Sequence, residues 1–211
     1  MIASPHPPDD DPWPPLTEGS VDPDPLVQFG RWFDDAAAVM ASPEAMALAT
    51  ATPDGRPSVR MVLLKAWGAD GFVFHTNYDS RKGHELTDSR SAALLFYWEA
   101  LGRQVRVEGA VERTTEEESD AYFVTRPHGG QIGARGSHQS RPIADRDLLD
   151  ARVVALEAEY AGRPVPRPEW WGGVRIRPHS FEFWQNRADR LHDRLLYTPS
   201  ATGWGLVRLQ P

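Results

Sequence analysis

Hydrophobic residues recur at intervals of three or four positions after residue 24, and this spacing predicts an amphipathic helix. The helix begins with Asp24-Pro25, an N-cap residue followed by proline at the first helical position. Its end is predicted near residue 41. The apolar positions on one face are Leu26, Phe29, Trp32, Phe33, Ala37 and Met40.

Beyond this helix the pattern changes to short segments in which apolar and polar residues alternate, which is typical of β-strands. The strands are predicted at 46–52, 58–66, 71–76, 91–98, 103–111, 174–176, 181–184, 191–197 and 204–209. Two further helices are expected, one from a capping box at Thr114 and Glu117 and one over about residues 144–160. Many short antiparallel strands with few helices predict a mainly β fold with peripheral helices (α+β), built as a closed or split β-barrel.

The composition of the chain indicates a boundary between a tail and a folded domain near the N-terminus. Residues 1–30 contain six acidic residues, no lysine or arginine, and eight of the 19 prolines, so they account for most of the net charge of −7. We therefore expect a disordered, acidic, proline-rich tail over residues 1–22 and one folded domain over residues 23–211.

Several classes of function are excluded by patterns that the sequence lacks. Without cysteine there are no disulfides, thiolate metal sites or cysteine nucleophiles, and the seven histidines never take the spacing of a metal site. No glycine-rich nucleotide loop or Gly-x-Ser-x-Gly sequence is present. The near-neutral body lacks the basic surface that nucleic acid requires. No apolar stretch approaches the ~20 residues that span a membrane, and no signal peptide is evident, so a cytoplasmic protein is expected.

A cationic run near the C-terminus is the strongest candidate for a binding site. Arg190, His192 and Arg194 alternate with other residues between two apolar segments. In a hairpin, a period of two would place these side chains on one face, close to Trp184. Such a face suits an anionic, planar ligand, and the alternative interpretation is a solvated strand face.

Further cationic and polar residues lie upstream. Arg60 and Lys65 are an odd number of positions apart, so they are expected on opposite faces of one strand. Residues 79–84 open a short helix, where backbone N–H groups favour phosphate. Tyr122 and Arg126 share a helix face, and residues 129–140 are predicted to form a glycine-rich polar loop. Together these groups indicate two anion pockets around an aromatic-lined cavity, which would bind a phosphorylated, flat cofactor or metabolite.

Seven segments follow one another in the order found in a known family. They are residues 60–65, 80–82, 103–105, 131–134, 139–140, 171–173 and 183–194. Through them the chain resembles the pyridoxamine (pyridoxine) 5'-phosphate oxidase family, whose members use FMN. The resemblance runs from about Asp24 to Pro211. It implies an FMN-binding split β-barrel and a homodimer with two sites at the subunit interface.

The resemblance also implies roles for individual residues in binding FMN. The group expected to hold the FMN phosphate and its chain is Arg60, Arg81, Lys82, Gln139 and Ser140, and the cofactor-binding segment also includes Met61, Val62, Leu63, Leu64 and Lys65. His75 and Thr76 match further flavin contacts, and Gln104, Trp184 and Arg194 match residues around the flavin ring.

Other matching residues are implied to bind the substrate. Lys65, Tyr122 and Arg126 match the clamp on the substrate phosphate, with Gly130 where the family commonly has Ser and where a backbone N–H could substitute. Arg190 and His192 match catalytic residues over the substrate ring. The chain departs from the family also at His75, where Tyr is usual, and it lacks an N-terminal Arg-Arg-x-Tyr segment that closes over the substrate.

The activity that the resemblance implies is the FMN-dependent oxidation of pyridoxamine 5'-phosphate or pyridoxine 5'-phosphate to pyridoxal 5'-phosphate, with O2 as acceptor and H2O2 as product. A hydride passes from C4' to flavin N5, and Arg194 is expected to stabilise the charge that develops on the ring. Two alternatives stay open. One is a sister split-barrel flavin oxidase that acts on another substrate, such as a phenazine precursor. The other is a non-catalytic carrier of flavin or pyridoxal phosphate.

Overall fold

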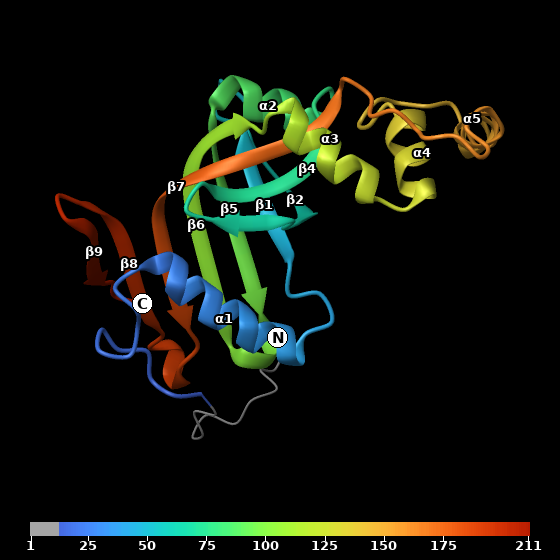
Figure 1. Cartoon of the computed structure of the whole chain (residues 1–211). Helices are drawn as coiled ribbons and strands as arrows, with labels where there is room; N and C mark the ends of the chain where they lie inside the picture. Colours follow the sequence, from blue (N-terminus) through green and yellow to red (C-terminus); the bar gives the residue numbers. More distant parts are fainter. Residues whose placement is uncertain (1–12) are drawn as a thin grey trace.

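The computed structural model of the chain describes residues 13–211. In this part, nine strands form one antiparallel sheet in the order β2-β1-β5-β6-β7-β4-β3, and β8 and β9 continue from β7 (Figure 1). The strands are β1 (Ala45–Ala51), β2 (Pro57–Leu63), β3 (Ala66–Gly68), β4 (Gly71–Asn77), β5 (Ser91–Trp98), β6 (Arg103–Arg113), β7 (Trp171–Gln185), β8 (Asp193–Ser200) and β9 (Gly203–Arg208). The helices are α1 (Pro25–Val39), α2 (Arg81–Ser89), α3 (Glu116–Thr125), α4 (His128–Gly136) and α5 (Arg146–Glu159), with 3-10 turns at Glu99–Leu101 and Ala188–Arg190. The predicted mainly β fold with peripheral helices is confirmed.

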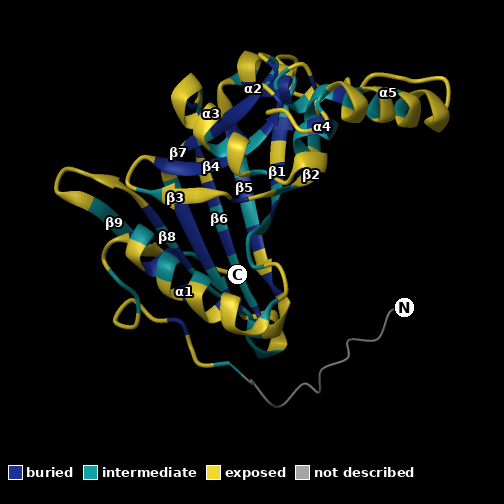
Figure 2. Cartoon of the chain, turned by 45° about the vertical axis from the view of Figure 1, so that its right-hand side comes forward, coloured by how far each residue is buried: buried dark blue, intermediate teal, exposed yellow. Residues whose placement is uncertain are grey.

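The main core is aromatic and lies between the curved sheet and α1. Phe29 of α1 is fully buried, and its ring meets those of Phe72 and Phe96 edge-on, with centroids 4.9 and 5.0 Å away. Every second residue of β5 is buried, as the alternating sequence predicts. Figure 2 shows buried central strands behind a helix whose outer face is exposed. The predicted start of α1 is confirmed, because the Asp24 side chain accepts a hydrogen bond from the Leu26 N–H at 2.8 Å.

Strand β7 corrects the prediction of two separate strands at 174–176 and 181–184. It runs without interruption from Trp171 to Gln185, and Pro178 lies inside it. The pairing with β6 shifts between Glu108 and Gly109, opposite this proline. A Cβ on Gly109 would lie 2.2 Å from the Arg177 carbonyl oxygen, so only glycine allows the strands to approach here. This irregular pairing allows β7 to continue past Pro178, where the sequence pattern predicts the end of a strand.

Two local predictions in the segment after β6 are wrong, the first of them by a single residue. The capping box consists of Thr115 and Glu118, each of which bonds the backbone N–H of the other. Thr114 is instead buried and shares a 2.9 Å hydrogen bond with Ser119. The glycine-rich segment predicted as a loop contains helix α4, and only residues after Gly136 are irregular.

The segment before α1 is packed on the domain over residues 13–22. Leu16 is 5% exposed and its N–H donates to Asp193 at 3.0 Å, while Glu18 pairs with Arg208 at 2.9 Å. The Tyr197 hydroxyl donates to the Asp22 carbonyl at 2.7 Å. The prediction of disorder is therefore wrong for residues 13–22, because specific polar contacts hold them on β8 and β9. The rest of the predicted tail lies outside the described residues.

Helices α3, α4 and α5 extend to one side of the barrel (Figure 1). They share a second, smaller core of Phe123, Ile132, Val165 and Trp171. Trp171 is the first residue of β7, so this core is joined directly to the sheet. None of the helices in residues 13–211 has the length and apolar character needed to cross a membrane.

Replacing Phe29 by alanine should destabilise the fold by about 3–5 kcal/mol, because it leaves a cavity among packed aromatic rings. Chemical denaturation followed by circular dichroism would measure this loss. Val27→Ala in the same helix is the control, since Val27 is 45% exposed and should change the free energy of unfolding by no more than about 0.5 kcal/mol. Equal effects of the two substitutions would contradict this description of the core.

Candidate functional site

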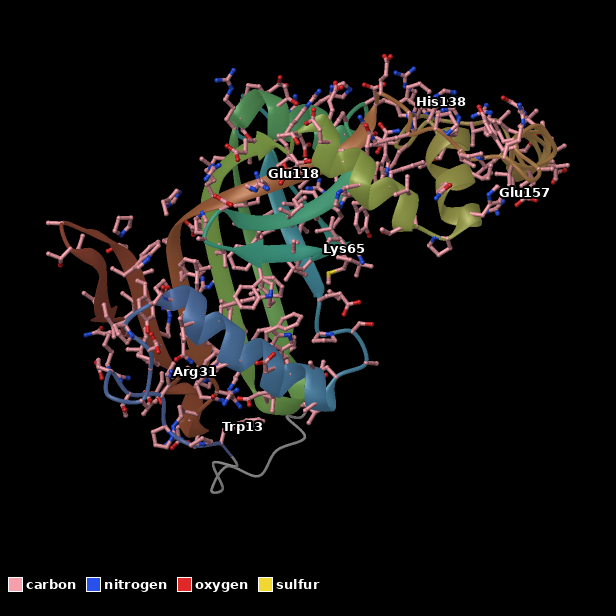
Figure 3. The ribbon with its side chains drawn as sticks, in the orientation of Figure 1. Trp13, Arg31, Lys65, Glu118, His138 and Glu157 are labelled. Atoms are coloured by element: carbon pink, nitrogen blue, oxygen red, sulfur yellow. The ribbon has the colours of Figure 1, made fainter. Side chains whose placement is uncertain are left out.

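A cavity of about 850 Å³ opens between β2, β4, the start of α2 and the helices α3 and α4. Its volume lies within the ~300–1,000 Å³ typical of small-molecule sites. Figure 3 shows Lys65 beside the barrel, on the side toward these helices. The predicted site residues that line the cavity are Arg60, Met61, Val62, Leu63, Lys65, His75, Thr76, Arg81, Lys82, Tyr122, Arg126, Gly130, Gln139 and Ser140.

Six predicted residues do not line this cavity: Leu64, Gln104, Trp184, Arg190, His192 and Arg194. Leu64 follows the last residue of β2 and is 5% exposed, because its side chain belongs to the main core. The other five lie on β6, β7, β8 and the connection between β7 and β8. A single chain therefore brings together most, but not all, of the predicted site.

Arg60 and Lys65 both line the cavity, so the expectation of opposite faces is wrong. The reason is that β2 ends at Leu63 and the strand alternation ends with it. The Lys65 N–H donates to the Val73 carbonyl at 2.8 Å, which anchors the chain at the start of the connection to β3. The two cations thus approach the same cavity from different backbone segments.

One part of the cavity wall is a cationic group at the start of α2. Ser80 caps this helix by accepting the Gly83 N–H at 3.3 Å, and the predicted start of a helix within residues 79–84 is confirmed. Lys82 donates to the Gln139 side chain at 2.5 Å, which ties α2 to the segment after α4. Burial, together with the nearby Arg60 charge, lowers the pKa of Lys82 to about 8. Backbone N–H groups and three cationic side chains make this end suited to a phosphate.

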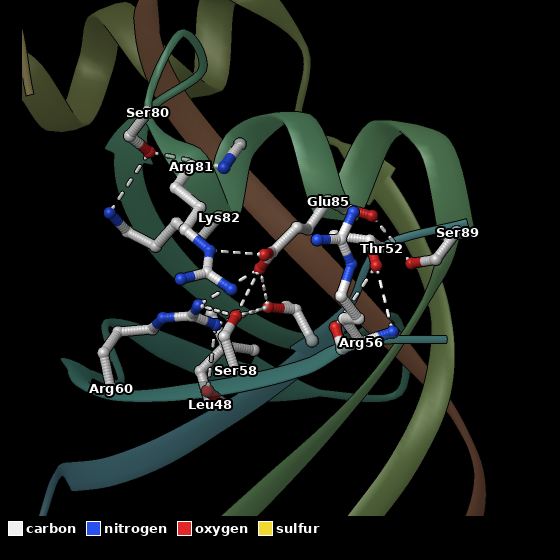
Figure 4. Close-up of polar contacts among 12 residues, drawn as sticks. Leu48, Thr52, Arg56, Ser58, Arg60, Ser80, Arg81, Lys82, Glu85 and Ser89 are labelled. Atoms are coloured by element: carbon white, nitrogen blue, oxygen red, sulfur yellow. Dashed lines mark hydrogen bonds and ion pairs between the residues drawn. The ribbon is translucent and has the colours of Figure 1, made fainter. Parts of the chain in front are cut away.

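Sequence patterns did not point to Glu85, although the structure places it beneath this cationic group. Its carboxylate accepts hydrogen bonds from Arg60 at 3.2 Å and from Arg81 at 2.7 Å (Figure 4). The available signal was the spacing of four residues between Arg81 and Glu85 on a predicted helix. That spacing is common on exposed helix surfaces, so it did not distinguish Glu85 from an ordinary surface carboxylate.

Aromatic rings and two further cations line another part of the wall. His75 stacks on Tyr122 with centroids 3.8 Å apart and planes 15° apart, and on Trp171 at 5.2 Å. The Arg126 guanidinium lies 4.6 Å from the Trp171 ring. Burial lowers the pKa of His75 to about 4, helped by the positive charges of Arg126 and Lys65, so His75 is neutral near pH 7.

Three buried polar atoms in the cavity residues have no hydrogen-bond partner within residues 13–211: His75 Nδ1, Thr76 Oγ1 and Arg126 Nη1. Buried polar groups usually bond to protein, ordered water or a ligand, so these three atoms are available to a molecule that enters the cavity. Gly130 does not supply the backbone donor that was expected in place of Ser, because its N–H already bonds the Pro127 carbonyl at 2.8 Å.

The expected alignment of Arg190, His192 and Arg194 on one strand face is wrong. Strand β8 begins only at Asp193, and Arg190 lies in a 3-10 turn where it and Asp189 take φ values of 62° and 54°. These left-handed conformations interrupt the alternation of an extended strand. His192 instead packs on Trp184 at 4.5 Å, and its Nδ1 accepts the Arg187 N–H at 3.2 Å.

Gln104, Trp184 and Arg194 form a row across three neighbouring strands, because Gln104 pairs with Trp184 and Trp184 with Arg194. The Glu182 carboxylate accepts from Arg194 Nε at 2.7 Å and Nη2 at 3.1 Å, and this hydrogen bonding raises the pKa of Arg194. This row is a second cluster of predicted site residues. It does not line the cavity of its own chain.

Two family models match the chain. One is described as "Pyridoxamine 5'-phosphate oxidase" and matches residues 33–160, and the other is described as "Pyridoxine 5'-phosphate oxidase C-terminal dimerisation region" and matches residues 171–211. The first match contains nearly all of the cavity residues. The second contains Trp184 and Arg194 of the second cluster.

Curated relatives are similar over almost the whole chain. The pyridoxine/pyridoxamine 5'-phosphate oxidase of Rubrobacter xylanophilus is 59% identical over 197 residues, which are 93% of this chain and 91% of the relative. The enzyme of the same name from a Nostoc species is 51% identical over 198 residues, covering 93% and 92% of the two chains.

Solved structures agree with the fold. PhzG from Burkholderia lata 383, in complex with tetrahydrophenazine-1-carboxylic acid, has a TM-score of 0.86 and 36% identity, and the match covers 93% of this chain and 98% of PhzG. An FMN-binding protein from Nostoc punctiforme, related to pyridoxamine 5'-phosphate oxidase, has a TM-score of 0.67 at 15% identity and covers 87% and 95%. The second likeness shows the fold alone, and together they confirm the predicted split barrel.

Affinity for FMN should fall as pH rises through about 8, because Lys82 then loses its proton and one cation disappears from the proposed phosphate end. The lowered pKa of a lysine means that its charge is present below that pH and absent above it. Flavin-fluorescence titrations between pH 6.5 and 9.5 would measure the change. Lys82→Arg should remove the pH dependence, since arginine stays charged, whereas Lys65→Arg should retain it. A decline of equal size in the wild type and Lys82→Arg would contradict the assignment.

Proposed function

The chain belongs to the pyridoxamine 5'-phosphate oxidase family, and we propose that it is an FMN-dependent oxidase that converts pyridoxine or pyridoxamine 5'-phosphate to pyridoxal 5'-phosphate. O2 is the electron acceptor and H2O2 the product. The observation that carries this proposal is one cavity with cations in two places and a stacked aromatic wall between β4 and α3. That arrangement suits two phosphate-bearing, planar molecules.

The residues at the start of α2 fit the FMN phosphate. Arg60, Arg81 and Lys82 supply charged donors there, and Thr76 offers a buried hydroxyl that lacks a partner within residues 13–211. Charge-assisted hydrogen bonds to phosphate contribute about 1.5–3 kcal/mol each. When bound, FMN supplies the acceptor for the hydride that leaves the substrate.

The aromatic part of the cavity fits the substrate phosphate. Lys65 and Arg126 provide two positive charges, and Arg126 Nη1 still requires an acceptor. Tyr122 is held in place by its stacking on the neutral His75 ring. These three cavity residues favour a phosphorylated substrate over the carboxylated ligand in the PhzG structure. Oxidation of a phenazine precursor is therefore the alternative that the substrate assay must exclude.

We further propose a homodimer in which the partner completes each site. The match to a C-terminal dimerisation region supports this assembly. It is also supported by the position of Trp184, Arg190, His192 and Arg194, none of which lines the cavity of its own chain. In the dimer, Arg190 and His192 would orient the substrate ring, and Arg194 would stabilise negative charge on the flavin without reorganisation, because Glu182 already fixes it. The expected cytoplasmic location stays a prediction.

The purified protein should contain one non-covalent FMN per chain and release H2O2 when given pyridoxine 5'-phosphate. Lys65→Ala should raise KM for this substrate about ten- to a hundredfold through the loss of one charged hydrogen bond, with unchanged flavin content. Arg190→Ala should lower kcat as well, because that residue is assigned to the reacting ring. Peroxide-coupled kinetics would test both. An unchanged KM for Lys65→Ala, or turnover only with a phenazine precursor, would overturn the substrate assignment.

Subunit complementation should test the shared site. Lys65→Ala/Arg126→Ala alters only the cavity side, and Arg190→Ala/Arg194→Ala alters only the other cluster, so each double variant should be nearly inactive. Co-expression should restore about a quarter of wild-type activity, because about half of the dimers are mixed and each mixed dimer has one intact site. Differently tagged chains would allow the mixed dimer to be isolated and assayed. A mixed dimer as inactive as its parents would show that both clusters act within one chain.

A further inference from the structure

Glu85 is a buried carboxylate at the floor of the cationic end of the cavity. It follows Arg81 by one turn of α2, and its side chain is only 4% exposed. Removing an ionised carboxylate from water is unfavourable unless hydrogen bonds and positive charge replace the solvent. The surroundings of Glu85 supply both, and Glu85 itself does not line the cavity.

Both carboxylate oxygens of Glu85 are occupied by protein donors (Figure 4). Oε2 accepts from the Thr50 hydroxyl at 2.5 Å, the Ser58 hydroxyl at 2.6 Å and Arg60 Nη2 at 3.2 Å. Oε1 accepts from Arg81 Nε at 2.7 Å. Burial alone would raise the pKa of Glu85, but these hydrogen bonds outweigh it and hold the pKa at about 2. Glu85 is therefore ionised at every pH at which the protein would work.

The same network sets which donors each arginine can offer to a ligand. The four Nη hydrogens of Arg60 have acceptors in Leu48, Thr50, Ser58 and Glu85, so only its Nε–H remains. Arg81 uses its donors in the opposite way. Its Nε–H donates to Glu85, and neither of its Nη groups makes a hydrogen bond within residues 13–211. Arg60 thus contributes mainly fixed charge, and Arg81 contributes the outward-facing fork of donors.

Charge also balances in this region. Arg60, Arg81 and Lys82 are three cations, and Glu85 is the one acidic side chain that pairs with them in the described part of the chain. With Glu85 ionised, these four side chains carry a net charge of plus two. This charge matches that of a phosphate monoester, which is about −1.5 to −2 near neutral pH. Without Glu85, the two guanidinium groups would repel each other at this end of the cavity.

We propose that Glu85 is a positioning residue for the flavin phosphate, which holds Arg60 and Arg81 in their binding orientation before the cofactor arrives. Thr50 and Ser58 act as relays, since each accepts from Arg60 and donates to Glu85. The inference rests on the proposed function in taking FMN as the ligand. A fixed donor set binds its anion without first being ordered, and that is the benefit of the buried network.

The test compares FMN with riboflavin, which has the same ring but no phosphate. The full-length protein, stripped of flavin, would be titrated with each by fluorescence quenching in 0.5 M salt, which screens long-range attraction. In Glu85→Gln, the preference for FMN over riboflavin should fall about tenfold or more, as expected for disruption of charged hydrogen bonds. Riboflavin affinity should not change, and this also shows that the variant is folded.

Thr50→Val separates orientation from charge. This substitution keeps the shape and the net charge of the region, and Thr50 is not a cavity-lining residue. It removes one relay between Arg60 and Glu85, so the preference for FMN should fall about three- to tenfold. Glu112→Gln is the matched control, because Glu112 also binds two arginines, Arg175 and Arg177, away from this cavity, and it should leave the preference unchanged.

Each outcome bears on the proposal. If Glu85→Gln and Thr50→Val both retain the wild-type preference for FMN, or if FMN binds more tightly to them, Glu85 does not position the phosphate cations and the proposal is wrong while the function stands. If Glu85→Gln fails to fold, the Thr50→Val result decides. A wild-type protein that does not prefer FMN over riboflavin overturns the proposed phosphate site, and this inference with it.

Discussion

Strand β7 is the constraint on which the rest of the structure depends, because its two edges hold together parts that would otherwise be separate. Along one edge, residues 174–185 pair with β6; along the other, residues 171–176 pair with β4 and residues 181–185 with β8. The β4 pairing places His75 and Thr76 in the cavity wall, opposite Gly173 and Gly172. The β8 pairing places Arg194 beside Trp184. Strand β7 therefore lies next to part of each cluster of candidate site residues.

Glycine at the start of β7 explains how the cavity wall packs so closely. A Cβ on Gly172 would lie 2.1 Å from the Tyr78 hydroxyl, and one on Gly173 would lie 2.4 Å from Thr114 Oγ1. A Cβ on Gly172 would also lie 2.8 Å from Ser119 Oγ of α3, so the missing side chain allows α3, which carries Tyr122, to approach the sheet. The neutral state of His75 follows from the same geometry, since burial and nearby cations disfavour a third positive charge.

The two ends of the site use charge differently. Near α2, a buried carboxylate accompanies the cations and leaves little freedom in Arg60. Near Trp171, Arg126 keeps an unpaired Nη1 within the described residues and stacks on an aromatic face instead. A rigid network that keeps part of its positive charge suits a cofactor that stays bound, whereas less strongly paired cations suit a substrate that must leave after each turnover. The ion pair between Glu182 and Arg194 follows the first pattern.

Local physics was sufficient for much of the fold. The period of hydrophobic residues located α1 and most strands, since amphipathic periodicity depends only on neighbours in the chain. Its failures came where distant residues intervene. Pro178 stays within β7 because Gly109 of another strand permits the irregular pairing. Residues 13–22 have a composition typical of a disordered segment. Leu16 and Glu18 nevertheless make hydrogen bonds with residues of β8 and β9, and these contacts cannot be inferred from composition.

For the site, the sequence by itself determined the residue types and, through resemblance, the family and the cofactor to expect. Charge type and motif order are properties of the chain, so they could be read from it. Only the tertiary structure decided which residues share a cavity. It brought Arg60 and Lys65 to one side because β2 ends between them, and it separated Arg190 and His192 from that cavity. The structure also showed that Glu85 is a buried carboxylate that pairs with two arginines. The sequence could not show this, because the burial of Glu85 depends on strands that are distant from it in the chain.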